Sequence, residues 1–453
     1  MSLLLTFYGD DFTGSTDALE QLTLAGIRTA LFIQPPPPAQ LKKFPGLQAI
    51  GVAGKTRSLS PDAMERELKP ALLALKKLGA KHIHYKICST FDSSPNIGSI
   101  GRVMDVAAKI FPAPIIPLLV AAPALGRYTI FGQHFARYGI GSAGQIYRLD
   151  RHPSVSKHTV TPMREADLRV HLARQTKKKI VLFDILHVAL PERAARVALQ
   201  KVLAEKPDVV LFDALYPEQM GSIGSLIDSL ASRKRPLFSV GSSGIEMALA
   251  SVWTVGDDVR NLKLKSKSMR PVTSSPAKQL LVGSGSCSPV TSGQIAWALK
   301  HGFAEVSLAP MKLVNRTTAN KEMLRAAAEA TKHLQAGRSV IVHTTRDGSD
   351  KRIVAKLKGR TAEVLGHALG KVLRAAVEQS SVQRVCIAGG DTSSYAAQAL
   401  GIEALEMIAP LTPGAPLCRA KAPGSPLNGR EMVFKGGQVG AKNYFEIVKR
   451  GKM

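Results

Sequence analysis

The sequence is poor in cysteine and in aromatic residues. Only four of its 453 residues are cysteines, and Phe, Trp and Tyr together make up 5% of the chain. The cysteines lie far apart, form no C-x-x-C pair and have no histidine at zinc-site spacing, which argues against a disulfide framework or a zinc site and favours reduced thiols. Basic patches interleaved with stacking aromatics, which single-stranded nucleic acid requires, are also missing. The cysteines are Cys88, Cys287, Cys386 and Cys418.

Long hydrophobic runs are missing as well. The longest apolar stretch, around 115–125, is interrupted by proline and is too short to span a bilayer. The first residues carry no basic segment and acidic residues arrive by Asp10, so we expect no secretory signal. A cytoplasmic protein without a membrane partner follows as the default expectation.

Acidic residues are few compared with basic ones. The chain has 61 Lys and Arg against 34 Asp and Glu, which gives a formal net charge of +27. Such an excess is compatible with a solvated basic surface, with attraction of acidic small molecules, or with nucleic-acid binding. We favour these in that order, because the basic residues are spread evenly, and we expect no specific nucleic-acid partner.

The pattern of apolar residues predicts an α/β fold in two domains. Short apolar runs alternate with helical patterns, which is typical of a mostly parallel sheet covered by helices on both faces, as in Rossmann-like domains. Near Asp257 this alternation stops, and a basic stretch with Ser and Pro follows. We therefore expect a first domain over 1–258, a linker over 259–278 and a second domain over 279–453, with a cleft between the domains.

We take the first strand and turn as the segment around which the chain is organised. An apolar run over 3–8 ends in Asp10 and Asp11, and a helical pattern follows. In an open α/β sheet such a junction lies at the edge where ligands bind. We hypothesise that one carboxylate, Asp11, handles a substrate hydroxyl; the alternative is that both residues only form the turn and cap the helix. The hydroxyl group of Thr13, Ser15 or Thr16 can also cap the helix, which would leave the first helix amides free to bind an anion.

Two further segments of the first half resemble known sites but lack essential residues. Gly54-Lys55-Thr56 ends like a phosphate-binding P-loop, but Ala49 stands where the first glycine belongs, so we reject that interpretation. His82 and His84 have a spacing that metals use, but no third ligand is nearby, and we predict no protein-built metal site.

Polar side chains follow two predicted strands of the first half. Arg57 lies at the end of the strand over 47–52, where its two-pronged guanidinium suits a carboxylate. The strand over 82–87 runs into 88–95, which is rich in hydroxyl groups that could contact a polyol or could simply form a turn. The charged segment 148–163 would fold over the site or support a subunit contact, which leaves a homodimer open.

The second half contains three glycine-rich turns. Gly283 to Pro289 lies between a strand and a helix, 388–394 repeats this pattern, and Lys435 to Gly440 ends another strand. Such turns let phosphate groups approach the backbone and helix N-termini. A dinucleotide fingerprint is incomplete because Ser288 replaces its third glycine. A nucleotide site is favoured, and a nicotinamide-dependent oxidoreductase remains the alternative.

Five ordered segments together resemble the four-carbon acid sugar kinase family over essentially the whole chain. Gly9 stands where Ala is common in that family. The segments are Gly9-Asp10-Asp11-Phe12-Thr13-Gly14, Cys88-Ser89-Thr90-Phe91-Asp92-Ser93, Ser284-Gly285-Ser286-Cys287-Ser288, Gly389-Gly390-Asp391-Thr392 and Lys435-Gly436-Gly437-Gln438-Val439-Gly440.

The resemblance implies an ATP-dependent kinase. Its first domain would bind a small acid sugar such as threonate, erythronate, a 3-oxo-tetronate or 3-oxo-isoapionate, and its second domain would bind ATP, with Mg²⁺ bridging the phosphates. The residues that would face the sugar acid are Asp10, Asp11, Arg57, Lys86, Ser89, Thr90 and Asp92. Those that would face the nucleotide are Ser284, Gly285, Ser286, Gly389, Gly390, Asp391, Thr392, Gly436, Gly437 and Gly440.

We assign provisional roles within this scheme. Asp11 would accept or orient the proton of the attacking hydroxyl, while Asp10 holds a second hydroxyl or the turn. Arg57 and Lys86 would clamp the substrate carboxylate. Lys435 would neutralise phosphate charge, and Asp391 would contact Mg²⁺ through water.

Overall fold

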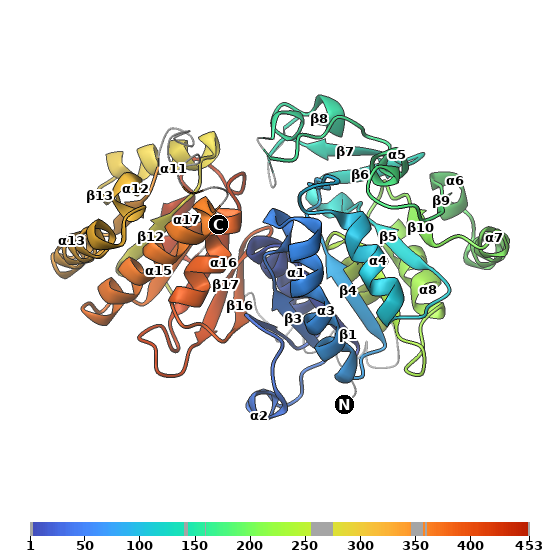
Figure 1. Ribbon diagram of the computed structural model, residues 1–453, viewed down its shortest axis with the longest axis horizontal. Coiled ribbons are helices and arrows are strands. Elements are labelled where there is room, and N and C mark those ends of the chain that lie inside the picture. Colours follow the sequence, from blue (N-terminus) through green and yellow to red (C-terminus); the bar gives the residue numbers. More distant parts are fainter. Residues whose placement is uncertain are drawn as a thin grey trace. The chain divides into compact units, whose positions relative to one another are not determined.

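The computed structural model describes residues 3–139, 144–158, 160–254, 275–345, 357 and 360–451. The chain forms two compact units, the first made of Met1–Ala30 and Gln34–Arg270, the second of Leu31–Ile33 and Pro271–Met453. Each unit contains a mostly parallel sheet flanked by helices (Figure 1), so the α/β prediction is confirmed. Of the linker predicted over 259–278, residues 259–274 lie outside the described ranges.

The first unit is built on a parallel sheet in the order β3-β1-β4-β11-β5-β10-β9. Most of its strands are buried on both faces, and they are rich in Val, Ile, Leu and Phe as such strands require. The strands are β1 (Leu5–Gly9), β3 (Ala49–Ala53), β4 (His82–Lys86), β5 (Ile116–Leu119), β9 (Ile180–Phe183), β10 (Val209–Phe212) and β11 (Leu237–Gly241).

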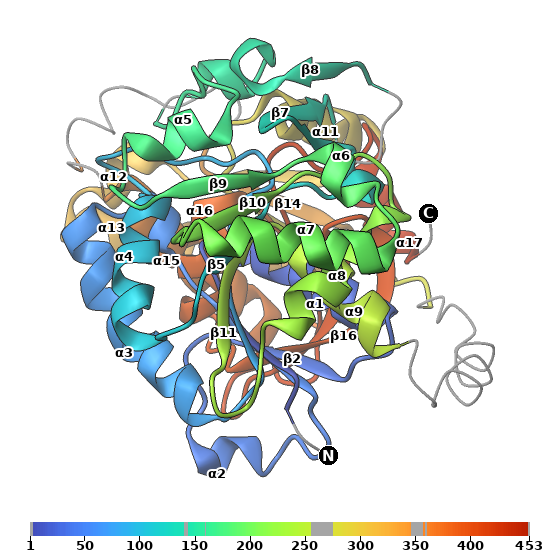
Figure 2. The ribbon, with the colours of Figure 1, turned by 90° about the vertical axis from the view of Figure 1, so that its right-hand side faces the viewer.

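Helices cover both faces of this sheet. On one face α3 and α4 lie side by side (Figure 1), and α3 turns Met64, Leu68, Leu72 and Leu75 into the core at helical spacing. On the other face α7, α8 and α9 enclose a second core (Figure 2). The helices are α1 (Phe12–Leu24), α2 (Pro38–Leu41), α3 (Pro61–Lys77), α4 (Ile100–Ile110), α5 (Leu168–Ala173), α6 (Ile185–Val188), α7 (Glu192–Ala204), α8 (Gln219–Ser229) and α9 (Gly244–Trp253).

A small antiparallel sheet lies at the carboxyl edge of the first unit's parallel strands (Figure 1). It consists of β6 (Arg127–Ile130), β7 (Gln133–Arg137) and β8 (Ile146–Arg148). The Thr129 amide donates to the Ala214 carbonyl at 3.0 Å, and the Gly132 amide donates to Asp213 Oδ1 at 3.1 Å. Residues just after β10 therefore hold this sheet in place.

The second unit has parallel strands in the order β13-β14-β12-β15-β18, continued by the antiparallel strands β17 and β16. Leu31 and Phe32, at the end of β2 (Thr29–Phe32), pair antiparallel with β16. The strands are β12 (Leu280–Ser284), β13 (Ala304–Ser307), β14 (Val340–His343), β15 (Arg384–Ala388), β16 (Ala404–Thr412), β17 (Ala415–Lys421) and β18 (Glu431–Lys435). The helices are α11 (Pro289–Lys300), α12 (Pro310–Leu313), α13 (Arg316–Gln335), α15 (Thr361–Glu378), α16 (Gly390–Ala399) and α17 (Tyr444–Arg450).

The described residues also bear on membrane crossing and on the state of the cysteines. In the described ranges, no helix combines the length and the apolar character that a membrane crossing requires. All four cysteines are free thiols, and Cys386 and Cys418 are buried.

Candidate functional site

The predicted substrate residues of the first unit meet at the carboxyl ends of three neighbouring strands. Asp10 and Asp11 follow β1, Arg57 lies just after β3, and Lys86 ends β4. Because β1 pairs with both β3 and β4 in parallel, these chain positions converge at one edge of the sheet. The structure therefore brings together residues that are up to 76 positions apart.

Asp11 is held from several sides. Its Oδ1 accepts a hydrogen bond from the Gly14 amide at 2.7 Å, and its Oδ2 accepts from the Thr13 hydroxyl at 2.8 Å and pairs with Arg57 Nη2 at 2.7 Å. Burial, the largest influence, disfavours the charge, but Arg57 and these hydrogen bonds together keep the pKa of Asp11 below its ordinary value. Asp11 is thus an ionised, anchored carboxylate.

Asp11, in extended conformation, is the N-cap of α1, a role that the sequence left open for it. The hydroxyl groups of Thr13, Ser15 and Thr16 were further candidates for this position. Ser15 and Thr16 instead donate to backbone carbonyls, at 2.6 Å to Asp11 and 2.9 Å to Thr13. The carboxylate takes the position because it precedes the helix and can accept two bonds at once.

Asp10 is about as buried as Asp11 but accepts fewer hydrogen bonds. Its Oδ2 accepts from the Cys88 amide at 3.2 Å, while its Oδ1 is buried and has no hydrogen-bond partner among the described residues. Burial, followed by the neighbouring charge of Asp11, raises the pKa of Asp10 to about 7, although Arg57 and Lys86 oppose the shift. Of the two carboxylates, Asp10 has the oxygen and the pKa that suit proton transfer.

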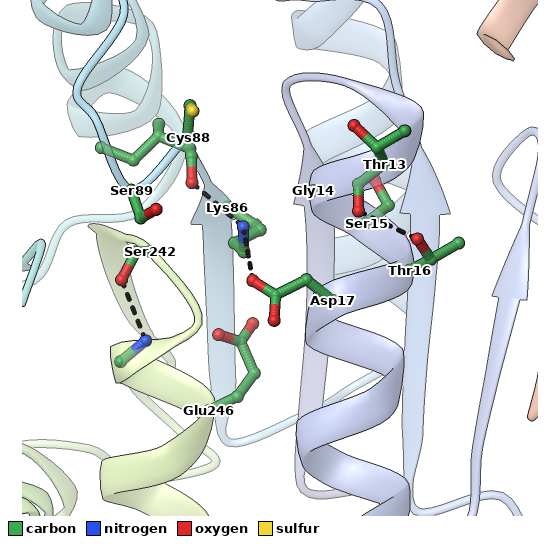
Figure 3. A network of polar contacts seen from close by, with 12 residues as sticks. Thr13, Gly14, Ser15, Thr16, Asp17, Lys86, Cys88, Ser89, Ser242 and Glu246 are labelled. Atoms are coloured by element: carbon green, nitrogen blue, oxygen red, sulfur yellow. Dashed lines mark hydrogen bonds and ion pairs between the residues drawn. The ribbon is translucent and has the colours of Figure 1, made fainter. Parts of the chain in front are cut away.

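Lys86 lies at the centre of the buried cluster of titratable side chains shown in Figure 3. Its Nζ lies 3.3 Å from Asp17 Oδ2 on α1 and donates to the Ile87 carbonyl at 3.1 Å. Glu246, on α9, points toward the same place. Burial alone would lower the pKa of Lys86, but Asp17, Glu246 and Asp10 raise it, so the ammonium keeps its charge.

The hydroxyl-rich segment after β4 forms an ordered loop. The Thr90 hydroxyl donates to Asp92 Oδ1 at 3.1 Å, and Phe91 between them adopts a positive φ of 59° that is unusual for an aromatic residue. The Phe91 ring is fully buried, which holds this conformation in place. Ser89 Oγ accepts from Arg127 Nε at 3.2 Å, so β6 contacts the loop directly.

In the second unit two glycine turns pack against each other. A Cβ on Gly285 would clash with Thr392, and the Gly285 amide donates to the Ala388 carbonyl at 3.0 Å. Gly389 caps α16 with a positive φ of 135°, a conformation that favours glycine. The turns thus present the N-termini of α11 and α16 at one sheet edge. The side chain of Asp391 lies outside what the structure describes.

The third glycine segment joins these turns through Thr291 on α11. The Thr291 hydroxyl donates to the Gly437 carbonyl at 3.0 Å and accepts from Lys435 Nζ at 2.9 Å. Gln294 Nε2 lies 3.0 Å from the Gly440 carbonyl. Lys435 is fully buried, and burial lowers its pKa to about 7. Thr291 therefore connects the buried Lys435 amine to the third glycine segment.

Sequence reasoning missed three charged residues of the first unit. Asp17 and Glu246 complete the cluster around Lys86, and Arg127 supports Ser89. The turn before Glu246, Gly241 to Gly244, was recognisable as a strand end, but nothing in the local pattern linked it to Lys86. Within the described ranges, no group of three or more acidic, histidine or cysteine side chains is arranged to hold a metal.

Comparisons with known proteins cover both halves of the chain. Residues 5–249 match a family model described as a sugar-binding N-terminal domain, and residues 281–445 match one described as a nucleotide-binding C-terminal domain. A 3-oxo-isoapionate kinase of Paraburkholderia graminis is 41% identical, with 100% of this chain and 95% of that protein covered. A 3-oxo-tetronate kinase of Methylobacterium radiotolerans is 29% identical, with 98% of each chain covered.

Solved structures share the fold. A protein of Salmonella typhimurium LT2 gives a TM-score of 0.73 at 22% identity, covering 99% of each chain. A Haemophilus influenzae protein gives 0.66 at 21% identity, covering 98% of this chain and 99% of that one. At these identities the likeness concerns the fold alone.

Proposed function

Because this chain belongs to the four-carbon acid sugar kinase family, we propose that it transfers the terminal phosphoryl group of ATP to a hydroxyl of a small sugar acid, with 3-oxo-isoapionate as the first candidate substrate. The observation that carries the proposal is the 41% identity to a kinase of that acid along the entire chain. A nicotinamide-dependent oxidoreductase is not favoured, because the relatives compared above are kinases and the dinucleotide fingerprint is incomplete.

We assign acid-sugar binding to 1–258 and nucleotide binding to 279–453, with 259–278 as the linker. The second unit fits a nucleotide because its turns bring glycines, helix N-termini and Lys435 to one edge. Ser284 to Ser288, Gly389 to Thr392 and Gly436 to Gly440 would hold the phosphates. ATP supplies the transferred group when bound, and Mg²⁺ would have the phosphates and water as its main ligands.

Among the substrate residues, we propose that Asp10 receives the proton. As the acceptor hydroxyl oxygen bonds to phosphorus and the bond to the ADP oxygen breaks, the hydroxyl proton passes to Asp10 Oδ1, the buried oxygen without a partner. Asp11 and Arg57 would hold the turn and a substrate hydroxyl, and Ser89, Thr90 and Asp92 would contact further hydroxyls. Lys86, at the end of β4, would supply positive charge next to these residues. Products are the phosphate ester and ADP.

An ADP-release assay tests the proposal. Purified protein is incubated with ATP, Mg²⁺ and one acid at a time from a panel of 3-oxo-isoapionate, 3-oxo-tetronates, threonate and erythronate. We expect ADP release that depends on one of the 3-oxo acids, with a phosphate ester detected by mass spectrometry. Folded protein that releases no ADP with any of these acids would overturn the proposed function.

A further inference from the structure

Arg127 is a buried cation whose contacts are all with neutral groups. Its side chain is 5% exposed. Nη1 donates to the carbonyls of Leu125, Gly126 and Arg137 at 3.3, 3.2 and 3.1 Å, and Nε donates to Ser89 Oγ at 3.2 Å. Among the described residues, no carboxylate lies within ion-pair distance of this guanidinium, and Nη2 donates no hydrogen bond.

A guanidinium in this setting is costly without a counter-ion. Removing a cation from water is strongly unfavourable unless an opposite charge compensates it. Burial indeed lowers the pKa of Arg127, and Cys88, Asp17 and Asp92 only partly oppose the effect from a distance. The nearest histidine of β7, His134, adds no charge, because burial lowers its pKa to about 4. The surroundings of Arg127 are therefore electropositive, and no adjacent carboxylate of the described residues compensates the charge of its guanidinium.

The other two basic residues predicted to clamp the substrate differ in this respect. Arg57 pairs with Asp11 at 2.7 Å, and Lys86 pairs with Asp17 at 3.3 Å. Their charges are already compensated within the protein. Arg127 has no such partner among the described residues, and its planar fork matches the geometry of a carboxylate.

We propose that Arg127 binds the carboxylate of the acid substrate through Nη2, with the Ser89 hydroxyl as the second contact. The inference rests on the proposed function and names the residue that selects acids over neutral polyols. Its position suits a short acid, because Ser89 is adjacent to Cys88, whose amide holds Asp10. A carboxylate at Arg127 and a reacting hydroxyl at Asp10 would thus be held by consecutive residues of one loop.

Kinetics of Arg127→Gln and Arg127→Lys test this assignment. Arg196→Gln is the matched control, because Arg196 is an exposed residue of α7 in a surface ion pair with Glu192. We expect Arg127→Gln to raise KM for the acid by about 100-fold, the loss of one strong charge-assisted contact. Arg127→Lys should fall between wild type and Arg127→Gln, and KM for ATP should change less than about threefold. The control should match wild type.

Two additional readouts separate recognition from a structural role. A neutral tetritol of similar size is used as a second substrate. The ratio of kcat/KM for the acid to kcat/KM for the tetritol should be much smaller in Arg127→Gln than in wild type. Millimolar guanidinium should partly restore use of the acid. Should Arg127→Gln fail to fold, as judged by circular dichroism, Arg127→Lys decides the question. Wild type that is active while both variants keep KM for the acid within threefold overturns the inference; wild type inactive toward every acid overturns the proposed function instead.

Discussion

The Oδ2 of Asp11 lies 2.7 Å from Nη2 of Arg57, and the other oxygen of the same carboxylate caps α1. The adjacent Asp10 has one buried oxygen without a partner among the described residues. The two carboxylates of one turn are therefore in different electrostatic states, a separation that is typical of pairs with different roles. These states fit the proposed roles, in which Asp11 holds the turn and Asp10 receives the proton.

Replacing each carboxylate should separate these roles. We expect Asp10→Asn to lower kcat by about 100-fold or more, the usual contribution of a general base, with little change in thermal stability. Asp11→Asn still caps the helix but removes the negative charge that lies 2.7 Å from Arg57, so its main effect should be a lower unfolding temperature. Steady-state kinetics and thermal unfolding measure both. The reverse result, a large kcat loss only for Asp11→Asn, would restore the hypothesis drawn from the sequence.

Lys435 should make nucleotide binding depend on pH. Its pKa in the free protein is lowered to about 7, and a phosphate beside it would raise that pKa. Protonation thus favours binding, so affinity is fully present below pH 7 and falls, by up to tenfold per pH unit, as pH rises above it. Calorimetry in buffers of different ionisation enthalpy should detect proton uptake on binding.

Two variants provide the controls for Lys435. Lys435→Gln should weaken binding at pH 6 and remove the proton uptake, while Lys442→Gln, at an exposed position, should behave as wild type. Nucleotide affinity that is equal at pH 6 and pH 9 in wild type would exclude Lys435 from phosphate contact.

The sequence predicts which site residues lie at strand ends, but it does not predict which charged side chains of the site lie next to one another. Asp10 and Arg57 each follow a short apolar run that ends in polar or turn residues, and Lys86 ends a segment that alternates polar and apolar residues; both local patterns are visible without the fold. The packing of Asp17 and Glu246 around Lys86 was not predictable, because it joins three segments that only the tertiary fold brings together. The ion pair of Asp11 with Arg57 likewise joins two segments that only the pairing of β1 with β3 brings together.

Two antiparallel elements were missed for a different reason. β16 contains Pro410, and β17 contains Pro416, and proline usually argues against a strand. Here the pairing register shifts between Met407 and Thr412, and such an irregularity tolerates a residue without an amide hydrogen. The strand that carries Arg127 has only four residues, too few for a clear periodicity.

Glu246 should make stability fall as pH rises. It is fully buried, neither carboxylate oxygen has a hydrogen-bond partner among the described residues, and burial raises its pKa to about 8 from an ordinary 4.5, with Lys86 opposing the shift. Between these values the folded chain holds a proton that the unfolded chain has released, so stability decreases with increasing pH. Glu246→Gln should lose this dependence.

The unfolding temperature of Glu246→Gln relative to wild type is the quantity to follow. We expect it to rise by at least about 3 °C between pH 5 and pH 8, since 1 kcal/mol shifts the midpoint by about 2–4 °C in a domain of this size. Glu218→Gln, at an exposed position, serves as control. A constant difference across the pH range would mean that Glu246 is ionised throughout.

Gly9 and Ser15 should show coupled energetics. A Cβ on Gly9 would clash with Ser15 Oγ, which donates to the Asp11 carbonyl at 2.6 Å and so stabilises the turn. Gly9→Ala should therefore overpack the site and cost about 1–3 kcal/mol. In Gly9→Ala/Ser15→Gly the clash with the Ser15 side chain is absent, and the Asp11 carbonyl oxygen, 3.2 Å from the added Cβ, is the remaining close neighbour. The double variant should therefore be more stable than the sum of the single effects by at least about 1 kcal/mol. Denaturant unfolding of all three variants measures the coupling.

The pair Gly9→Ala and Thr16→Gly provides the control. Its effects should be additive, because the atoms nearest to a Cβ on Gly9 belong to Ser15 and Asp11 and not to Thr16. Additivity in the Ser15 cycle would show that α1 shifts to accommodate the methyl group, and that this glycine is not required by the serine beside it.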